Sequence, residues 1–182
     1  MDKRNDIIAG AERIFETQGF RGPGVDGILA PSRASTRTLY KHFGNRDGLV
    51  IAVLERRHND FMARLYSRGP DADPIGDLFD IQEQWMRERG SKGCMLMRAR
   101  GEYAGANSDI AELVTRQKQE FEREVAKRVE ATLGKANAEL ATQIWLLFEG
   151  ATATASISSQ PVVDMAKRAA RALVALARKD PE

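Results

Sequence analysis

Apolar and polar residues follow one another along this chain with the period of an α-helix. The first helix is predicted from about residue 2 to residue 18, because apolar residues recur there at helical spacing and Asp2 stands where an N-cap belongs. Gly19 ends this helix, and Phe20 closes over the core. The apolar stripe consists of Ile7, Ile8, Ala11, Ile14 and Phe15.

The rest of the chain shows no sustained alternation of the kind expected in a strand. Glycine and proline limit a second helix to about residues 25–30, Ser35 caps a third, and Gly44-Asn45 separates it from a long helix that starts near Arg46. The segment RGPDADP, residues 68–74, is the clearest linker. Beyond it, helices are predicted at about 75–88, 94–103, 110–133 and 138–159, followed by a last helix with Pro161 in its first turn. The pattern predicts an all-α fold of about nine helices.

Composition is typical of a folded protein. Of 182 residues, 42% are hydrophobic and 30% are charged. Cys94 is the single cysteine, so no intramolecular disulfide is possible, and the N-terminal MDKRNDII lacks the apolar run of a signal peptide. No apolar segment approaches the roughly 18 residues of a membrane-spanning helix. We therefore expect a cytoplasmic protein that does not enter the membrane.

Basic residues are concentrated in one short segment. The net charge of the whole chain is only +2, but the segment from Phe20 to Arg46 contains five basic residues and a single acid, Asp26. A local basic patch is typical of a module that binds a polyanion. The alternative is an ordinary solvated face.

The chain is poor in the side chains that most often perform catalysis. It has two histidines, His42 and His58, and neither has a metal-type partner three or four residues further on. The motifs HExxH, GxxxxGK[ST], CxxC and GxSxG are all missing. We expect no catalytic residue, no metal ligand and no cofactor. A small helical enzyme, as an alternative, would reveal itself by a copurifying metal or cofactor.

The segment STRTLYKHF, residues 35–43, combines packing residues with many hydrogen-bond donors. On a helix, Leu39 and Phe43 share one face, while Arg37 and Lys41 share another about 160° away. Free backbone amides and the helix dipole also favour anions at the first turn. Such a surface suits the major groove of DNA, where arginine reads guanine and threonine contacts thymine methyls.

The same segment resembles a known family signature. The run Ser35-x-x-Thr38-Leu39-Tyr40-x-His42-Phe43-x-x-Arg46-Asp47-x-Leu49 is similar to that of TetR/AcrR-type bacterial transcriptional repressors, S-x-x-T-L-Y-x-H-F-x-x-K-[ED]-x-L. The resemblance extends from about Ile7 to Leu54. It implies a three-helix helix-turn-helix DNA-binding domain at 1–47, followed by a helical effector-binding and dimerisation domain at 48–182.

The resemblance also implies which residues contact operator DNA. Thr36, Arg37, Thr38 and Tyr40 match the groove-facing positions, and in such folds Thr38 also packs near the helix start. The positions that match or flank phosphate-contacting ones are Lys41, His42 and Arg46. The backbone amides of Gly24 and Val25 could serve a phosphate at the start of the second helix.

Three residues depart from the family pattern. Pro23-Gly24 stands where a capping hydroxyl is common, so a side-chain phosphate contact is lost there. Pro31 falls near the end of the second helix, which we expect to stop early or kink. Arg33 replaces the glycine usual in the turn, and in the left-handed conformation it would be strained by about 1 kcal/mol.

The C-terminal half is expected to bind an effector and to form a homodimer through the last two helices. Small residues at 150–156 would let another helix approach closely. The effector, an apolar or aromatic small molecule, would shift the population away from the DNA-binding conformation, as the resemblance implies. Candidate effector-binding residues are Trp85, Met86, Met95, Met97, Tyr103, Phe121, Trp145 and Phe148.

The remaining alternative for the whole chain is a helical interaction module that binds an acidic protein.

Overall fold

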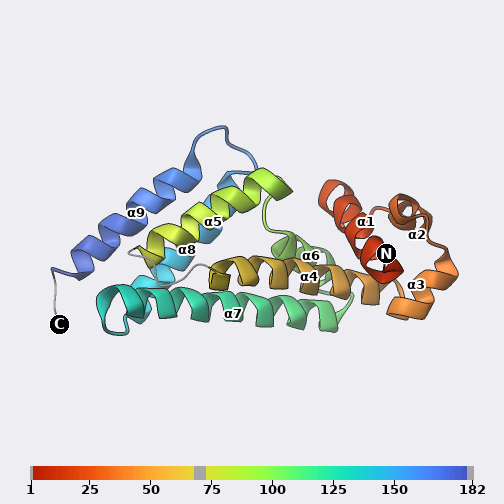
Figure 1. Cartoon of the computed structure of the whole chain (residues 1–182), viewed down its shortest axis with the longest axis horizontal. Helices are drawn as coiled ribbons and strands as arrows, with labels where there is room; N and C mark the ends of the chain where they lie inside the picture. Colours follow the sequence, from red (N-terminus) through yellow and green to blue (C-terminus); the bar gives the residue numbers. More distant parts are fainter. Residues whose placement is uncertain (1, 68–72, 180–182) are drawn as a thin grey trace. The chain divides into compact units, whose positions relative to one another are not determined.

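The structure is a computed structural model that describes residues 2–67 and 73–179, and the regular elements in these ranges are all helical. The linker predicted at 68–74 falls largely outside the described residues. The elements in chain order are α1 (Lys3–Gln18), α2 (Val25–Leu29), the 3₁₀ turn η1 (Ala30–Ser32), α3 (Thr36–Phe43), α4 (Arg46–Ser67), α5 (Pro74–Arg89), α6 (Met95–Tyr103), α7 (Ser108–Leu133), α8 (Ala138–Thr154) and α9 (Val162–Ala177) (Figure 1). The predicted all-α fold is confirmed.

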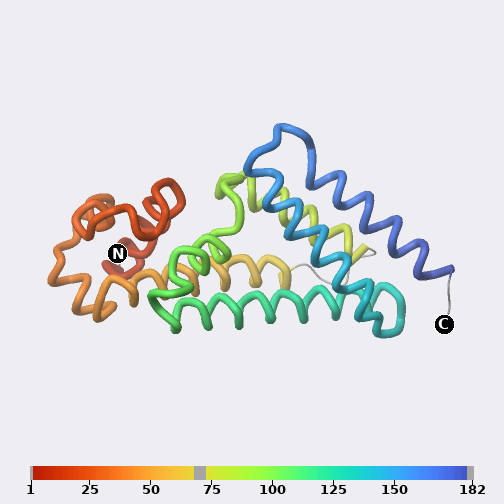
Figure 2. The backbone as a smooth tube through the Cα atoms, turned by 180° about the vertical axis from the view of Figure 1, so that it is seen from behind, coloured from red at the N-terminus to blue at the C-terminus, as the bar shows by residue number. Residues whose placement is uncertain are grey.

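The chain divides into two compact units. The first consists of Met1–Asp60 and Met95–Arg116, and the second of Phe61–Cys94 and Gln117–Glu182. Helices α4 and α7 each contribute residues to both units. Both helices can be followed by residue number along the tube in Figure 2. This division differs from the boundary expected at residue 47, because Met95, Tyr103 and Ile110 are buried in the same core as the first three helices. The functional division at 1–47 and 48–182 stays a prediction.

The first helix begins and ends where the sequence predicts. The Asp2 carboxylate accepts a hydrogen bond from the backbone N–H of Arg4 at 3.0 Å. Gly19 ends the helix with φ of 78°, and its N–H donates to the carbonyl of Phe15. Phe20 is fully buried, as expected.

Two predictions about the last helices are wrong in detail. Helix α8 ends at Thr154 rather than near residue 159, because the N–H groups of Ser156 and Ile157 bond the carbonyls of Ala153 and Thr154 in tight turns. The Ser156 hydroxyl also donates to Ala153 O at 2.6 Å. Pro161 occupies the N-cap of α9 rather than its first turn.

Helix α6 is bonded to the end of α1 within the first unit. The Glu102 carboxylate accepts hydrogen bonds from the backbone N–H groups of Phe20 and Arg21, at 2.9 and 2.8 Å. The Arg98 guanidinium donates to two of the last carbonyls of α1, those of Phe15 and Glu16. A side chain on Gly19 would lie 3.1 Å from Glu102 Oε1. The backbone of the turn after α1 is therefore held by α6.

In the second unit, α9 packs against both α5 and α8 (Figure 1). Arg128 of α7 closes the ends of two other helices, since its guanidinium donates to the carbonyls of Leu65 and Pro74 at 2.8 and 2.9 Å. The core of this unit includes Phe79, Phe121 and Phe148. No described helix combines the length and the apolarity needed to cross a membrane.

Candidate functional site

Helix α3 has defined ends. The Ser35 hydroxyl accepts a hydrogen bond from the backbone N–H of Thr38 at 3.2 Å and lies 2.9 Å from the Thr38 hydroxyl. At the other end, Gly44 adopts φ of 75° and its N–H donates to the carbonyl of Tyr40 at 3.0 Å. The predicted cap is confirmed, and the helix is eight residues long.

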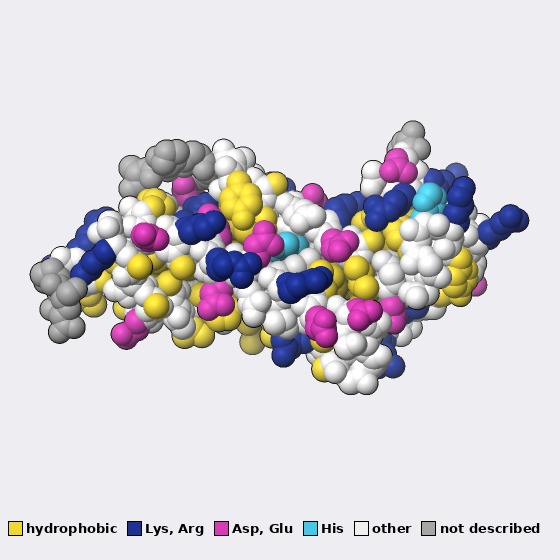
Figure 3. Space-filling view, turned by 90° about the horizontal axis from the view of Figure 1, so that it is seen from below, with side chains coloured by type: hydrophobic (Ala, Val, Ile, Leu, Met, Phe, Trp, Pro, Cys, Tyr) yellow, Lys and Arg dark blue, Asp and Glu magenta, His cyan; other side chains and the backbone are white. Residues whose placement is uncertain are grey.

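The two faces of α3 differ as the angular argument predicts. Leu39 is fully buried and Phe43 is partly buried against the same core. The opposite side is exposed, and Tyr40 is 56% accessible although it is a large aromatic residue. The space-filling view shows basic side chains and a histidine gathered over the helices of the first unit, on the right (Figure 3). The predicted contact residues that are exposed on α3 are Thr36, Arg37, Tyr40, Lys41 and His42.

Thr38 has a different environment from its neighbours. It is half-buried, and its hydroxyl and N–H both engage Ser35. Its predicted role in base contact is not tested, but these bonds give it a structural role at the start of α3.

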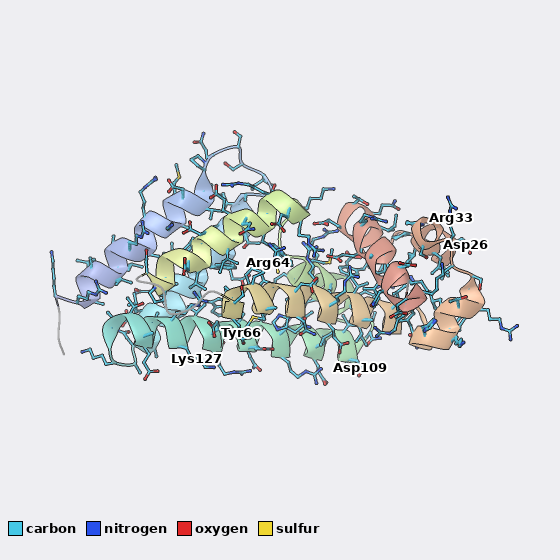
Figure 4. All side chains as sticks on the ribbon, in the orientation of Figure 1. Asp26, Arg33, Arg64, Tyr66, Asp109 and Lys127 are labelled. Atoms are coloured by element: carbon cyan, nitrogen blue, oxygen red, sulfur yellow. The ribbon has the colours of Figure 1, made fainter. Side chains whose placement is uncertain are left out.

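The turn before α3 shows the effects expected of Pro31 and Arg33. Helix α2 ends at Leu29 and continues as the 3₁₀ turn Ala30–Ser32, so the helix stops early as predicted. Arg33 adopts the left-handed conformation with φ of 51°. Figure 4 shows Arg33 beside Asp26 on the outer side of α2 and this turn.

The start of α2 has the backbone geometry that the sequence suggests. Gly24 is the N-cap, and no side chain caps the helix there. Gly24 is exposed, whereas Val25 is half-buried against the core. The predicted phosphate contact of their amides stays a prediction.

Arg46 is engaged within the first unit. Its guanidinium donates to the carbonyls of Phe20 and Pro23 and, at 2.9 Å, to the Tyr103 hydroxyl. Burial raises the pKa of Tyr103 above its usual range although Arg46 acts to lower it, so the phenol stays neutral and can accept this bond. These bonds assign Arg46 a structural role, and its predicted phosphate contact is not tested.

The structure separates the eight predicted effector residues between the two units. Met95 and Tyr103 are buried in the first core, and Met97, on the same helix, is 49% accessible. The other five belong to the second unit and include two buried residues, Phe121 and Phe148. The remaining three are Trp85, Met86 and Trp145.

Aromatic rings from four helices meet in the second unit, and we call them the ring cluster: Phe61, Trp85, Phe121 and Phe148. Phe61 of α4 has its ring centroid 5.3 Å from Trp85, 5.8 Å from Phe121 and 6.0 Å from Phe148. The rings of Phe121 and Phe148 are 4.6 Å apart. Phe61 was not among the candidate effector residues, so sequence reasoning missed its position here.

Sequence reasoning also missed Gln82, which lies against this cluster. Its side chain is buried, and its Nε2 donates to the Phe148 carbonyl at 2.8 Å and to the Thr152 hydroxyl at 2.7 Å. The signal was present in the sequence, because Gln82 follows Leu78 and Phe79 at helical spacing and so falls on the apolar face of α5.

Comparison with known proteins relates the first part of this chain to a protein family. The model of the bacterial regulatory proteins, tetR family, matches residues 7–53. This range begins after the first turn of α1, includes α2 and α3, and ends within α4. Residues 7–53 are thus assigned to the tetR family. The chain is 31% identical over 79 residues to the HTH-type transcriptional repressor NicS of Pseudomonas putida. That alignment covers 43% of the chain and only 37% of NicS.

Solved structures of TetR-family regulators share the whole fold. A TetR-family transcriptional regulator from Streptomyces coelicolor superimposes with a TM-score of 0.89 at 22% identity, covering 97% of this chain and 96% of that one. The multidrug binding protein EbrR, solved with malachite green, has a TM-score of 0.73 at 17% identity, covering 95% and 98% of the two chains. The family consists of regulatory proteins, which agrees with the expectation that the chain is not an enzyme.

Proposed function

We propose that this protein is a homodimeric transcriptional repressor that binds operator DNA through α3 and leaves it when a small aromatic or apolar molecule binds. The observation that carries the proposal is the exposed face of α3, which presents Arg37, Tyr40 and Lys41 opposite the buried Leu39. A helix held by one apolar face can place the opposite face in the major groove.

The residues of this face have distinct roles. Arg37 lies in the first turn, from which a guanidinium can pair with both acceptors of a guanine. Lys41 and His42 lie in the last turn, where they suit phosphates on either side of the groove. The exposed Tyr40 adds a hydroxyl and an aromatic edge between them.

The test is a titration of the full chain with duplexes selected from a random pool, at several salt concentrations. Lys41→Ala should weaken binding to all duplexes and lower the salt slope by about 0.9 for each of the two copies in the dimer, or about 1.8 in all. Arg37→Ala should relax the preference at one base position and cost about 1–3 kcal/mol against the preferred base. Lys127→Ala, an exposed lysine of α7 labelled in Figure 4, is the matched control and should change neither quantity.

The same titration separates this proposal from the alternative of an acidic protein partner. Absence of sequence preference, together with unchanged salt slopes in both α3 variants, would contradict the DNA-binding proposal. A partner of acidic protein chemistry would then be the better explanation of the basic face.

Effector response is proposed for the second unit. EbrR is a multidrug binding protein solved with malachite green, and its fold matches nearly the whole of this chain. The ring cluster offers the kind of apolar surface that binds aromatic molecules. An effector that binds better to a conformation with low DNA affinity shifts the population toward that conformation.

Dimerisation is proposed through α8 and α9. Each helix has an exposed apolar stripe at positions three or four residues apart, which suits helix-on-helix packing around a two-fold axis. Gly150 and Ala153 in the first stripe, and Ala169 and Ala172 in the second, allow close approach. The stripes consist of Leu146, Gly150 and Ala153 on α8 and Met165, Ala169, Ala172 and Leu176 on α9, and the exposed Ile157 follows the end of α8.

A further inference from the structure

The amide of Gln82 has an unsatisfied oxygen in the interior of the second unit. The residue is only 2% exposed. The Phe148 carbonyl can only accept a hydrogen bond, so the amide nitrogen must face it, as the 2.8 Å contact shows. The Oε1 atom is thereby directed elsewhere, and it has no hydrogen-bond partner among the described residues. A buried acceptor without a donor is uncommon and requires an explanation.

The indole of Trp145 has the complementary property. Its Nε1 is buried and has no acceptor among the residues that the structure describes. Phe148 and Thr152 follow Trp145 by three and seven residues, so the three share one side of α8 within an arc of roughly 60°. Gln82 is bonded to this same side, at Phe148 and Thr152. An unpaired acceptor and an unpaired donor therefore belong to one region of the unit.

The ring cluster lines this region with aromatic faces and edges. Phe148 belongs both to the cluster and to the residues that bond Gln82. Gln82, Trp85 and Met86 share one side of α5, because they are three and four residues apart. Met86 packs against the same core, and its unbranched side chain can change rotamer to admit a ligand.

Two guanidinium groups contact the indole of Trp85. The guanidinium groups of Arg64 and Arg89 lie 4.9 and 5.1 Å from the ring centre of Trp85. Figure 4 shows Arg64 between α4 and α5. Arg64 is also paired with the Glu88 carboxylate, but the electron-rich face of the indole is already in contact with two guanidinium groups, so a cationic ligand would gain little cation–π attraction there.

We infer that this region binds an uncharged aromatic molecule that donates one hydrogen bond to Gln82 Oε1 and accepts one from Trp145 Nε1. A phenol or a hydroxylated heteroaromatic compound has this combination of groups. The inference rests on the proposed function, since it names the chemical class of the effector. The physical reason is that a ligand with both groups satisfies two buried polar atoms, whereas a hydrocarbon of the same shape leaves them unpaired.

The experiment measures Kd of the full chain for three compounds of one ring system by calorimetry. The compounds are β-naphthol, which donates and accepts, β-methoxynaphthalene, which only accepts, and β-ethylnaphthalene, which does neither. We expect β-naphthol to bind about tenfold more tightly than the methoxy compound, and the methoxy compound to bind more tightly than the hydrocarbon. The cationic dye malachite green should bind more weakly than β-naphthol.

Variants identify the atoms responsible. Gln82→Leu should abolish the difference between β-naphthol and β-methoxynaphthalene, and Trp145→Phe should abolish the difference between the methoxy compound and the hydrocarbon. The control is Gln84→Leu, an exposed glutamine on the same helix, which should keep both differences. If the Gln82 variant fails to fold, the order of affinities in the unmodified chain still decides the matter.

Equal affinities for the three compounds, no binding of any, or tighter binding of the cationic dye would overturn the inference. Persistence of the naphthol preference in folded Gln82→Leu would also overturn it. Failure of the proposed effector response would give a different result. Release of bound DNA by some other compound would preserve the proposed function while this series fails. The expected affinity order without any effect on DNA would support the site and contradict the effector response.

Discussion

Arg33 is the non-glycine residue with positive φ in the described part of the chain, at 51°. The left-handed conformation costs an arginine about 1–2 kcal/mol, whereas a glycine adopts it freely but loses about 0.5–1 kcal/mol through unfolded-state entropy. Arg33→Gly should therefore raise the free energy of unfolding by up to about 1 kcal/mol, measured by urea denaturation. Arg33→Val should lower it by about 1 kcal/mol or more, because a branched side chain tolerates this φ least. Equal stability of the two variants would contradict this explanation.

At the scale of single residues, the sequence predicted local features correctly but not the contacts between distant residues. The caps at Asp2 and Ser35 and the effect of Pro31 depend on neighbours within four residues, and all three were predicted correctly. Arg46 shows the limit, because its partners Phe20, Pro23 and Tyr103 are 23 to 57 residues away in sequence. A helical pattern indicates which face is exposed but not which distant groups a long side chain reaches.

Gln82 illustrates the same limit for the candidate effector site. Its place on an apolar face was visible in the sequence, but its bonds to Phe148 and Thr152 depend on the approach of α5 to α8. The eight candidates chosen from the sequence were selected by size and softness alone. The structure divides them between two cores, because similar apolar stripes recur on helices that belong to different units.

At the scale of elements, the contact between α6 and the end of α1 makes the next prediction. Glu102→Ala removes the acceptor of the Phe20 and Arg21 amides, which should lower the free energy of unfolding by about 1–3 kcal/mol. The matched control is Glu112→Ala, an exposed acid of α7 in the same unit, which should change stability by less than about 0.5 kcal/mol. Urea unfolding measures both, and equal effects of the two variants would contradict the assigned role.

Gly19 tests the same contact from the other side. Its φ of 78° disfavours any side chain, and a Cβ would lie 3.1 Å from Glu102 Oε1. Gly19→Ala should therefore destabilise the chain by about 1 kcal/mol or more. In the Glu102→Ala background the cost should shrink, because the close approach is gone and only the backbone strain remains. Fully additive losses would show that the two residues do not interact.

Helix boundaries were predicted well where a strong signal stands beside them. Gly19 and Gly44 end α1 and α3 as expected. The end of α8 was misplaced because alanine, serine and threonine at 151–159 contain no strong breaker. Local hydrogen bonds of Ser156 determine where the helix ends there. These bonds compete with the hydrogen bonds of a longer helix, and the two arrangements are nearly equal in energy.

For the whole molecule, the units were harder to predict than the helices. The sequence suggested a boundary after the helix-turn-helix segment, yet α6 and the start of α7 complete the core of the first unit. Periodicity gives the apolar side of each helix but not the helix that covers it. The family signature constrained only the first part of the chain, since the matching model spans residues 7–53.

The proposed dimer rests on apolar surfaces that one chain leaves exposed. Leu176 of α9 is 62% accessible, and Leu146 of α8 has the same exposed fraction. In a two-fold symmetric dimer each substitution occurs twice, and burial of a leucine contributes about 1.5–3 kcal/mol. Leu176→Glu should therefore weaken the dimer roughly 100-fold or more, measured as Kd by sedimentation equilibrium.

The control for this prediction is Met97→Glu, which places the same charge on an exposed apolar residue of α6 and should leave Kd of the dimer unchanged. Operator binding should fall in parallel with dimerisation in Leu176→Glu, because two recognition helices on one duplex bind far more tightly than one. At protein concentrations well above the new dimer Kd, operator binding should recover, since α3 itself is intact. A monomeric unmodified chain, or a Leu176→Glu variant that stays fully dimeric, would show that α8 and α9 do not form the interface.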